Sequence, residues 1–305
     1  MYLVRRVGIV DSITRYREIS KVLWQVLVLN WAVASAKIIL GYLSGSASMT
    51  ADGFHSLDDG ASNIVGLIGI KIASRPVDED HPYGHKKYET LASAAIGAML
   101  FAVALGVARS AVSRLLHPVT PEITAASFIV MFGTMVVNGL VSRYERRAGV
   151  RLQSDVLISD SKHTRSDLFV SGSVIASLIA VRLGFSLLDT ISSLVIAGLI
   201  GASAYGIWKE SFGVLVDQSR IDGDEIKRIA LAVSGVEACH RVRSRGRDDD
   251  LKIDLHIQVK PDMSIEDAHQ VGHKVEERIR EEYSNVTDVV VHTEPFAGVD
   301  PKPPR

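Results

Sequence analysis

The chain has 305 residues, 47% of them hydrophobic, and a formal net charge of −1 at pH 7. A charge so near zero excludes a chain that is strongly basic overall, so nothing in the composition points to nucleic-acid binding. The lone Cys239 excludes an intramolecular disulfide and a multi-cysteine zinc site. The long apolar runs lie between residues 22 and 210, which indicates a membrane domain followed by a small soluble one.

The predicted domains follow this change in composition. Residues 1–21 are charged and lack the continuous apolar core of a cleavable signal peptide, so we expect a cytoplasmic N-terminal segment. Residues 22–210 form the predicted membrane domain, 211–297 a soluble cytoplasmic domain, and 298–305 a tail.

Six apolar segments are long enough to cross a bilayer as helices, namely 22–43, 47–70, 90–113, 123–141, 155–181 and 185–207. Thirteen Lys and Arg residues flank these spans on one side, and three, Arg109, Arg114 and Arg182, on the other. By the positive-inside rule, this bias predicts that both termini are cytoplasmic. A soluble all-α bundle is the alternative interpretation of the same helices.

Two spans carry the same pair of polar residues. His55 and Asp59 lie in the second span, and His163 and Asp167 in the fifth, so each pair shares one helix face. Asp59 lies about 12 residues into the second span from residue 47, and Asp167 lies about 12 residues from the cytoplasmic end of the fifth span; each depth is ~18 Å, which is near the middle of the bilayer. Two imidazoles and two carboxylates suit a tetrahedral divalent metal, zinc above all. The alternative is a set of buried hydrogen bonds or a proton relay without metal.

Other acidic and histidine residues near the spans receive weaker assignments. Asp58 lies about 100° around the helix from Asp59, and Asp52 lies two turns away, so neither is predicted as a direct ligand. After the second span, "RPVDEDHPYGHKKYE" offers Asp78, His81 and His85 across a short loop. By residue type alone, this loop is equally well explained as a solvated charged segment.

The soluble part is predicted to fold as α-β-β-α-β, with elements at 223–233, 236–245, 250–260, 264–283 and 286–294. The stretch "LKIDLHIQVK" alternates with the period of a half-buried strand, whereas "SIEDAHQVGHKVEERIREEY" has helical periodicity. The chain is therefore predicted to be an all-α membrane protein with a C-terminal α+β domain. His240, His256 and His292 fall on the strands and His269 on the second helix. Taken singly, each of these histidines is more often a surface residue than a ligand.

Three stretches, "SGSASMTADGFHSLDDGASN", "ASRPVDEDHPYGHKKYETLAS" and "DSKHTRSDLFVSGSV", resemble the cation diffusion facilitator family of divalent-metal exporters. The resemblance extends from about residue 20 to 297. It implies a homodimer with six spans, a cytoplasmic domain with a metallochaperone-like fold, and exchange of metal for protons. It also implies that His55, Asp59, His163 and Asp167 form the transport site. His55 resembles the zinc-preferring form of this site.

The resemblance also assigns roles outside the transport site. Asp78, His81 and His85 match the family's loop metal site, and Lys87 and Asp217 match its charge interlock. A cytoplasmic metal cluster at the dimer interface matches His240, His256, His269 and His292, with Glu294 where the best-known bacterial type has Asp. His273 has no match in this cluster. Because Glu is longer than Asp, the number of metal ions in this cluster stays open.

These observations predict a secondary transporter, not an enzyme, that exports Zn²⁺ from the cytoplasm in exchange for protons. Zinc is expected also as a structural or regulatory ion in the cytoplasmic domain. The expected partners are an identical chain, divalent metal ions, protons and membrane lipid, with no nucleic acid, and the expected location is a bacterial inner membrane. The alternatives are an exporter of iron, manganese or several divalent metals, an intramembrane metalloenzyme, or a metal sensor that does not transport. The enzyme alternative lacks a His-Glu-x-x-His motif.

Overall fold

The computed structural model describes residues 12–44, 47–116, 125–182, 186–296 and 298. It divides into two compact units, a helical one up to Phe212 and a mixed α/β one from Gly213 onward. Each unit has its own hydrophobic core. The two units are therefore described separately.

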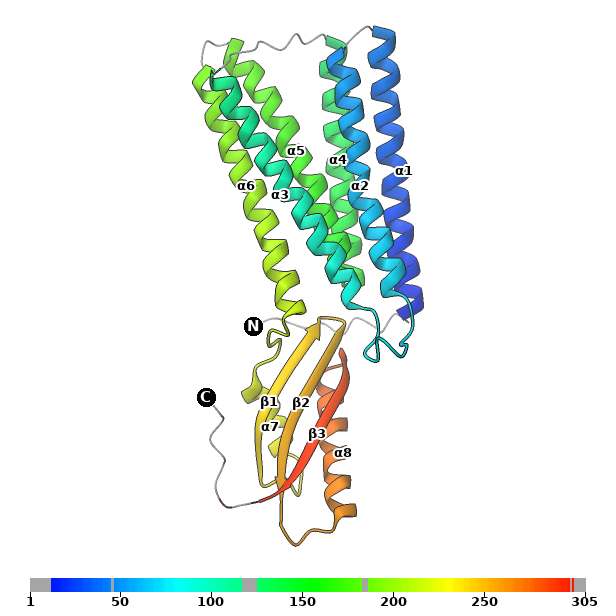
Figure 1. The fold of residues 1–305 in the computed structure, drawn as a ribbon, viewed down its shortest axis with the longest axis vertical. Helices are drawn as coiled ribbons and strands as arrows, with labels where there is room; N and C mark the ends of the chain where they lie inside the picture. The colour runs from blue at the N-terminus through cyan, green and yellow to red at the C-terminus, as the bar shows by residue number, and fades with distance from the viewer. Residues whose placement is uncertain (1–11, 45–46, 117–124, 183–185, 297, 299–305) are drawn as a thin grey trace. The chain divides into compact units, whose positions relative to one another are not determined.

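The helical unit consists of long helices that run alongside one another (Figure 1). They are α1 (Ser12–Ser44), α2 (Ala47–Ala73), α3 (Lys87–Leu116), α4 (Ala125–Leu152), α5 (Asp155–Arg182) and α6 (Ser186–Leu215). Each corresponds to one predicted apolar segment. Two stretches of the described helices, Thr14–Ile39 and Lys87–Arg109, are long and apolar enough by composition to cross a bilayer.

The first helix begins ten residues before the predicted span, at Ser12 and not at residue 22. Tyr16 and Ile19 explain the difference, because both are buried in the core of the helical unit together with Leu23. The predicted N-terminal segment is thus partly helical. Its charged residues are interspersed with the buried Tyr16 and Ile19, so the segment forms an amphipathic turn that continues directly into the apolar helix.

A buried ion pair links three helix ends. The Arg15 guanidinium lies 3.1 Å from the Glu89 carboxylate, and their side chains are 8% and 0% exposed. Arg15 also donates to the backbone carbonyls of Leu152 and Gln153, each at 2.8 Å, and Ser154 donates to Glu89 at 2.6 Å. The beginnings of α1 and α3 are therefore fixed to the α4–α5 junction. Sequence reasoning placed Arg15 on the cytoplasmic side but did not find this pair.

The helices of this unit pack closely at small residues. A Cβ atom added at Gly66 of α2 would lie only 2.8 Å from Cγ1 of Val156 on α5, so glycine permits the two helices to approach. Helix α6 packs against α3 through a separate cluster of Leu100, Ala104, Ile200, Ala204 and Ile207. The close α2–α5 approach brings together the two helices that carry the predicted transport ligands.

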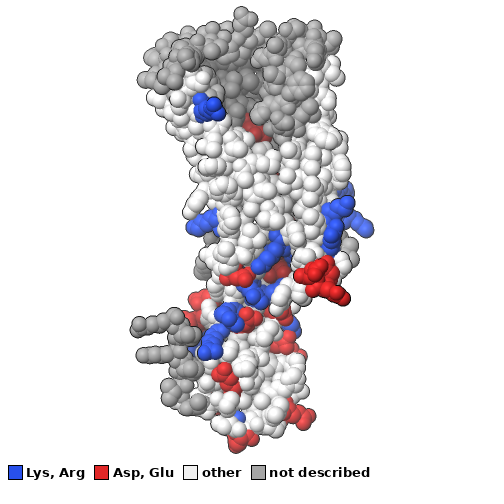
Figure 2. Space-filling view, viewed as in Figure 1, with Lys and Arg blue, Asp and Glu red and all other residues white. Residues whose placement is uncertain are grey.

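Large apolar side chains also cover the outside of the helical unit. Those that are exposed include Trp24, Val28, Ile39, Ile68, Leu105, Phe132, Leu140 and Leu199. On the face shown in Figure 2, charged side chains of this unit gather toward the end where the α2–α3 loop lies, and a broad uncharged band covers its middle. A surface of this kind is suited to contact with lipid tails.

The α/β unit confirms the predicted αββαβ order. Its elements are α7 (Gly223–Leu231), β1 (Ala238–Arg247), β2 (Asp250–Val259), α8 (Ile265–Glu282) and β3 (Val286–Pro295). Asp222 and Ser264 cap the two helices, each accepting a hydrogen bond from a backbone N–H of the first turn. The sheet order is β1-β2-β3, with β1 antiparallel and β3 parallel to β2.

The strand alternation separates the core of this unit from its metal-binding candidates. Leu251, Ile253, Leu255 and Ile257 of β2 are buried in one core with residues of both helices. The alternate residues of β2, His256 among them, point to the opposite face of the sheet. The histidines on the strands therefore lie on the face that the helices do not cover.

Candidate metal sites

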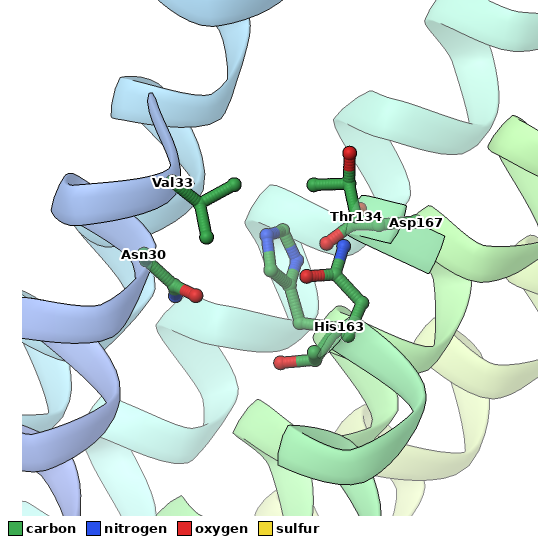
Figure 3. Close-up of a pocket in the computed structure, with 7 residues that line it drawn as sticks. Asn30, Val33, Thr134, His163 and Asp167 are labelled. Carbon is green, nitrogen blue, oxygen red and sulfur yellow. The ribbon is translucent and has the colours of Figure 1, made fainter. Parts of the chain in front are cut away.

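The first candidate site is a small polar cavity between α1, α4 and α5. Its lining residues are Asn30, Val33, Thr134, Asn138, His163, Thr164 and Asp167. Figure 3 shows the imidazole of His163 projecting between the helices, with Asp167 and Thr134 beside it. The cavity volume is about 10 Å³, which is close to the space that one water molecule needs. Two of the four predicted transport ligands thus line a space of the size of a single ion.

The other two predicted ligands, His55 and Asp59, belong to α2. Their side chains lie outside the described residues, as do those of Asp52 and Asp58. The backbone of α2 keeps His55 and Asp59 one helical turn apart on one side of the helix. Completion of the site by these residues remains a prediction.

Direct contact between α2 and α5 occurs one turn from the predicted ligands. Asn63, four residues after Asp59, donates a short hydrogen bond to the carboxylate of Asp160, three residues before His163. Asn30 of α1 donates to Asn63 at 3.2 Å, so α1 joins the same contact. The polar faces of α2 and α5 are therefore turned toward each other beside the cavity.

A second acidic residue, Glu145 of α4, lies in the same polar layer. Glu145 and Asp160 are both fully buried, and the Thr164 hydroxyl lies 3.0 Å from Oε2 of Glu145. Glu145 Oε1 and Asp160 Oδ1 have no hydrogen-bond partner among the described atoms. A buried carboxyl group is stable when it is protonated, hydrogen-bonded or paired with a cation. Glu145 and Asp160 thus add two buried ionisable groups to the four predicted ligands.

Sequence reasoning missed Asn63, Glu145 and Asp160 as functional candidates. Helical spacing could have indicated two of them. Asn63 follows Asp59 by one turn, and Asp160 precedes Thr164 by one turn, so each continues the polar face of its helix. Glu145 gave no such signal, since it lies beyond the predicted end of its span.

The second candidate site is in the loop between α2 and α3. Ligand atoms of Asp78, His81 and His85 all lie within 4.8 Å of one another. Oδ1 of Asp78 is 3.0 Å from Nδ1 of His81, and Oδ2 is 3.3 Å from Nε2 of His85. Gly84 has φ 81°, which lets the chain turn back between the two histidines. The structure therefore gathers the three residues predicted for this loop.

His85 has the support that a metal-binding histidine needs. Its Nδ1 lies 3.1 Å from the carbonyl oxygen of Pro76, so an N–H there donates to the backbone and Nε2 faces Asp78, where a metal ion would replace the Nε2 proton. Desolvation acts to raise the pKa of Asp78, but hydrogen bonds from His81 and the nearby imidazole charges lower this pKa below its ordinary value. Asp78 is thus ionised and suited to a cation. Its ligand role remains a prediction.

The third candidate site lies on the open face of the sheet. His240 pairs in register with His256, and His256 with His292, so the three histidines form a row across the strands. Glu294 lies beside this row, 2.8 Å from Nδ1 of His256, 3.2 Å from Nε2 of His240 and 3.6 Å from Nε2 of His292. One carboxylate therefore reaches all three imidazoles.

One carboxylate together with three imidazoles is a suitable set of ligands for a borderline-soft divalent cation such as Zn²⁺. The hydrogen bond from His256 lowers the pKa of Glu294, helped by the charges of the three imidazoles and opposed by desolvation. His269 does not join the row within one chain, because α8 packs on the opposite face of the sheet, where Nε2 of His269 lies 3.1 Å from Nε2 of His273. Its predicted place in the cluster requires a second chain and remains a prediction.

Lys87 and Asp217, the residues of the predicted charge interlock, belong to different units. Lys87 is the first residue of α3, and Asp217 follows α6 with φ 57°. Their pairing remains a prediction.

Comparison with known proteins identifies the class to which these sites belong. Residues 23–216 match the family described as the cation efflux transmembrane domain, and residues 219–296 match the cytoplasmic domain of cation efflux proteins. The chain therefore belongs to the cation efflux, or cation diffusion facilitator, family. Its members are membrane transporters of divalent metal cations and not enzymes, and the matched cytoplasmic domain is a dimerisation domain.

Individual relatives come from archaea, bacteria and plants. The uncharacterized transporter MJ0449 of Methanocaldococcus jannaschii is 34% identical over 91% of this chain and 99% of its own length. The manganese efflux system protein MneS of Bacillus subtilis is 32% identical over 87% of this chain and 91% of its own. The magnetosome protein MamB of Paramagnetospirillum magneticum is 28% identical over 90% and 94%.

Proposed function

We propose that this protein exports divalent transition-metal ions, zinc foremost, from the cytoplasm in exchange for protons. His55, Asp59, His163 and Asp167 would bind the ion between α2 and α5. Imidazole must be neutral to bind metal, so an arriving proton competes with the metal for the same nitrogen. Proton entry thereby promotes metal release.

The observation that carries this proposal is the contact between α2 and α5. The Asn63–Asp160 hydrogen bond sets the two helices face to face one turn from the predicted ligands. His163 and Asp167 line an ion-sized cavity next to this contact. A site of two imidazoles and two carboxylates at this place matches the ligand preferences of zinc.

The proposal includes six membrane spans, with both termini and the α/β unit in the cytoplasm. Helices α1 to α6 have 27 to 33 residues each, which exceeds the ~20 residues needed to cross a bilayer. The exposed apolar side chains and the bias of Lys and Arg support the same arrangement. A homodimer in a bacterial inner membrane completes the proposal.

Manganese is the second candidate cargo. The relative named as a manganese efflux system protein is 32% identical, and the polar layer next to the cavity adds the carboxyls of Glu145 and Asp160. Oxygen-rich sites favour harder cations such as Mn²⁺, whereas the imidazoles of His55 and His163 favour zinc. The identity of position 55 is therefore the main argument for zinc.

Transport by the purified protein in proteoliposomes tests the function. We expect zinc uptake to saturate, to move protons in the opposite direction, and to exceed the uptake of cadmium, iron(II) and manganese assayed side by side. Metal uptake without proton movement would contradict the exchange mechanism. Zinc binding without any uptake would identify a sensor, and larger uptake of manganese would make manganese the cargo.

A further inference from the structure

The exposed side of α8 carries a histidine pair that none of the sites above uses as a pair. His269 and His273 lie four residues apart, and both are exposed. Their Nε2 atoms are 3.1 Å apart, and their ring planes are inclined by 76°. The opposite side of α8 is anchored in the core through Val271, Val275 and Ile279. The two imidazoles therefore project from a helix whose position is fixed by packing.

Neighbouring residues orient the imidazole of His273. Its Nδ1 lies 3.2 Å from Oε2 of Glu276, and Glu276 is held by Arg280 at 2.6 Å. When Nδ1–H donates to this carboxylate, the Nε2 lone pair points toward His269. A carboxylate that fixes the tautomer in this way is the usual support of a metal-bound histidine.

The distance between the two nitrogens fits a shared ion. Two nitrogens that each lie 2.0–2.1 Å from a tetrahedral metal are about 3.3 Å apart. The observed separation of 3.1 Å requires only a small rotation of either ring. Both side chains are exposed, so the remaining coordination positions are open to water or to a side chain of another molecule.

We propose that His269 and His273 form a separate binding site for a divalent transition metal such as Zn²⁺, with Glu276 as the orienting residue. A pair of imidazoles selects zinc, nickel, cobalt or copper over the harder manganese ion. The site goes beyond the proposed transport function and does not depend on it. It assigns a role to His273, which has no counterpart in the cytoplasmic metal cluster that the family resemblance implies.

This assignment competes with the placement of His269 in the sheet cluster. If His269 served the row of His240, His256 and His292 of a second chain, its metal contact would be independent of His273. If the pair on α8 is the site, the metal contact of His269 requires His273. The two assignments therefore differ in what happens to His269 when His273 is removed.

Chemical protection on the full-length protein in detergent tests the proposal. The metal-free protein is titrated with zinc and treated with diethyl pyrocarbonate, which modifies free imidazole nitrogens, and each histidine is quantified by mass spectrometry. We expect zinc to protect His269 and His273 together, and His273→Ala to abolish protection of His269. Lys274→Ala, at the next position of the same helix, should leave the protection unchanged. Glu276→Gln should raise the half-protecting zinc concentration on the order of 10–100-fold.

Circular dichroism of each variant checks that α8 remains folded. Continued protection of His269 in the His273→Ala variant would overturn the proposal and return His269 to the sheet cluster. Equal reactivity of His273 with and without zinc would also overturn it. Manganese at the same concentration should give no protection, and equal protection by manganese would contradict the stated ligand class.

Discussion

At the scale of single residues, the transport site depends on a few ionisable side chains placed among apolar helices. The spacing of His163 and Asp167 predicted that they share a helix face, and both line one cavity in the structure. The buried Asp160 and Glu145 next to them were not predicted as functional. Helical periodicity describes one helix at a time, whereas their proximity depends on how α4 and α5 are rotated against each other.

Loss of a proposed ligand carboxylate should abolish transport. Asp167→Ala and Asp59→Ala each leave three of the four proposed ligands, so we expect zinc flux in proteoliposomes to fall to the level of empty vesicles. Asp58→Asn is the matched control and should retain most of the flux, because Asp58 is not assigned as a ligand. Flux at the wild-type rate in either alanine variant would show that the assigned residue is not a ligand. Gel filtration checks that the variants remain dimeric.

Position 55 should determine which metals are carried. The change His55→Asp replaces a nitrogen ligand by a harder oxygen and adds formal charge, so manganese or cadmium flux should increase relative to zinc. Zinc should still be transported. The measurement is the ratio of fluxes for the four metals, with Asp52→Asn and Asp58→Asn as controls. Unchanged ratios in His55→Asp, together with shifted ratios in Asp58→Asn, would instead make Asp58 the metal-facing residue.

At the scale of elements, the close packing of α2 on α5 positions the proposed site. The order and approximate extent of the elements could be predicted from apolar runs and strand alternation, including all five elements of the α/β unit. The pairing of His269 with His273 could not be assigned, because helical spacing permits that contact without showing which neighbours compete for it. Likewise, Arg15 and Glu89 are 74 residues apart in sequence, and nothing local connects them.

Gly66 should be sensitive to added volume. In Gly66→Ala the new methyl group would meet Val156 on α5, so we expect destabilisation of about 1–3 kcal/mol and reduced transport. Gly106→Ala is the matched control, because nothing lies within 4 Å of an added Cβ at that position of α3. There, alanine should stabilise the helix slightly. Thermal unfolding in detergent measures both variants, and equal melting temperatures would argue against close α2–α5 packing.

Acid should weaken the metal-free α/β unit through Glu294. The pKa of Glu294 is lowered in the folded state, so its contribution to stability is present above the unfolded pKa, about 4.3, and is lost as pH falls through the lowered value. We expect Glu294→Gln to reduce the dependence of unfolding free energy on pH in this acidic range. Denaturant unfolding at several pH values measures the effect. The exposed Glu266→Gln is a control, and an equal change there would assign the effect to general surface charge.

At the scale of the whole molecule, the chain combines a helical unit for passage of the ion with an α/β unit that has its own core and its own candidate metal sites. In the helical unit, the Arg15–Glu89 pair fastens the beginnings of α1 and α3 to the α4–α5 junction. None of these contacts involves helix α6, which packs on α3 through the separate cluster around Leu100 and Ile200. Conformational change during transport is therefore expected away from the fastened helix ends.

The isolated α/β unit should bind zinc and gain stability from it. A fragment of residues 212–305 contains the core around Ile253 and Val275 and the row of three histidines. At a free zinc concentration one hundred times the dissociation constant, the expected gain is about 2.7 kcal/mol. Calorimetry with and without zinc measures the gain, and His256→Ala should remove most of it. An unchanged melting temperature in zinc would contradict metal binding on the sheet.

Metal binding at the row of histidines would require that the sheet of the α/β unit is complete. His256 and Glu294 meet only after β3, the last of the described elements, has paired with β2, because 38 residues separate the two side chains in sequence. A growing chain that ends before residue 286 contains the β1–β2 hairpin but neither His292 nor the carboxylate. Because the binding free energy becomes available only when the last strand docks, unfinished chains bind metal weakly at this place. At this row of histidines, zinc would therefore stabilise only those chains in which β3 has already docked onto β2.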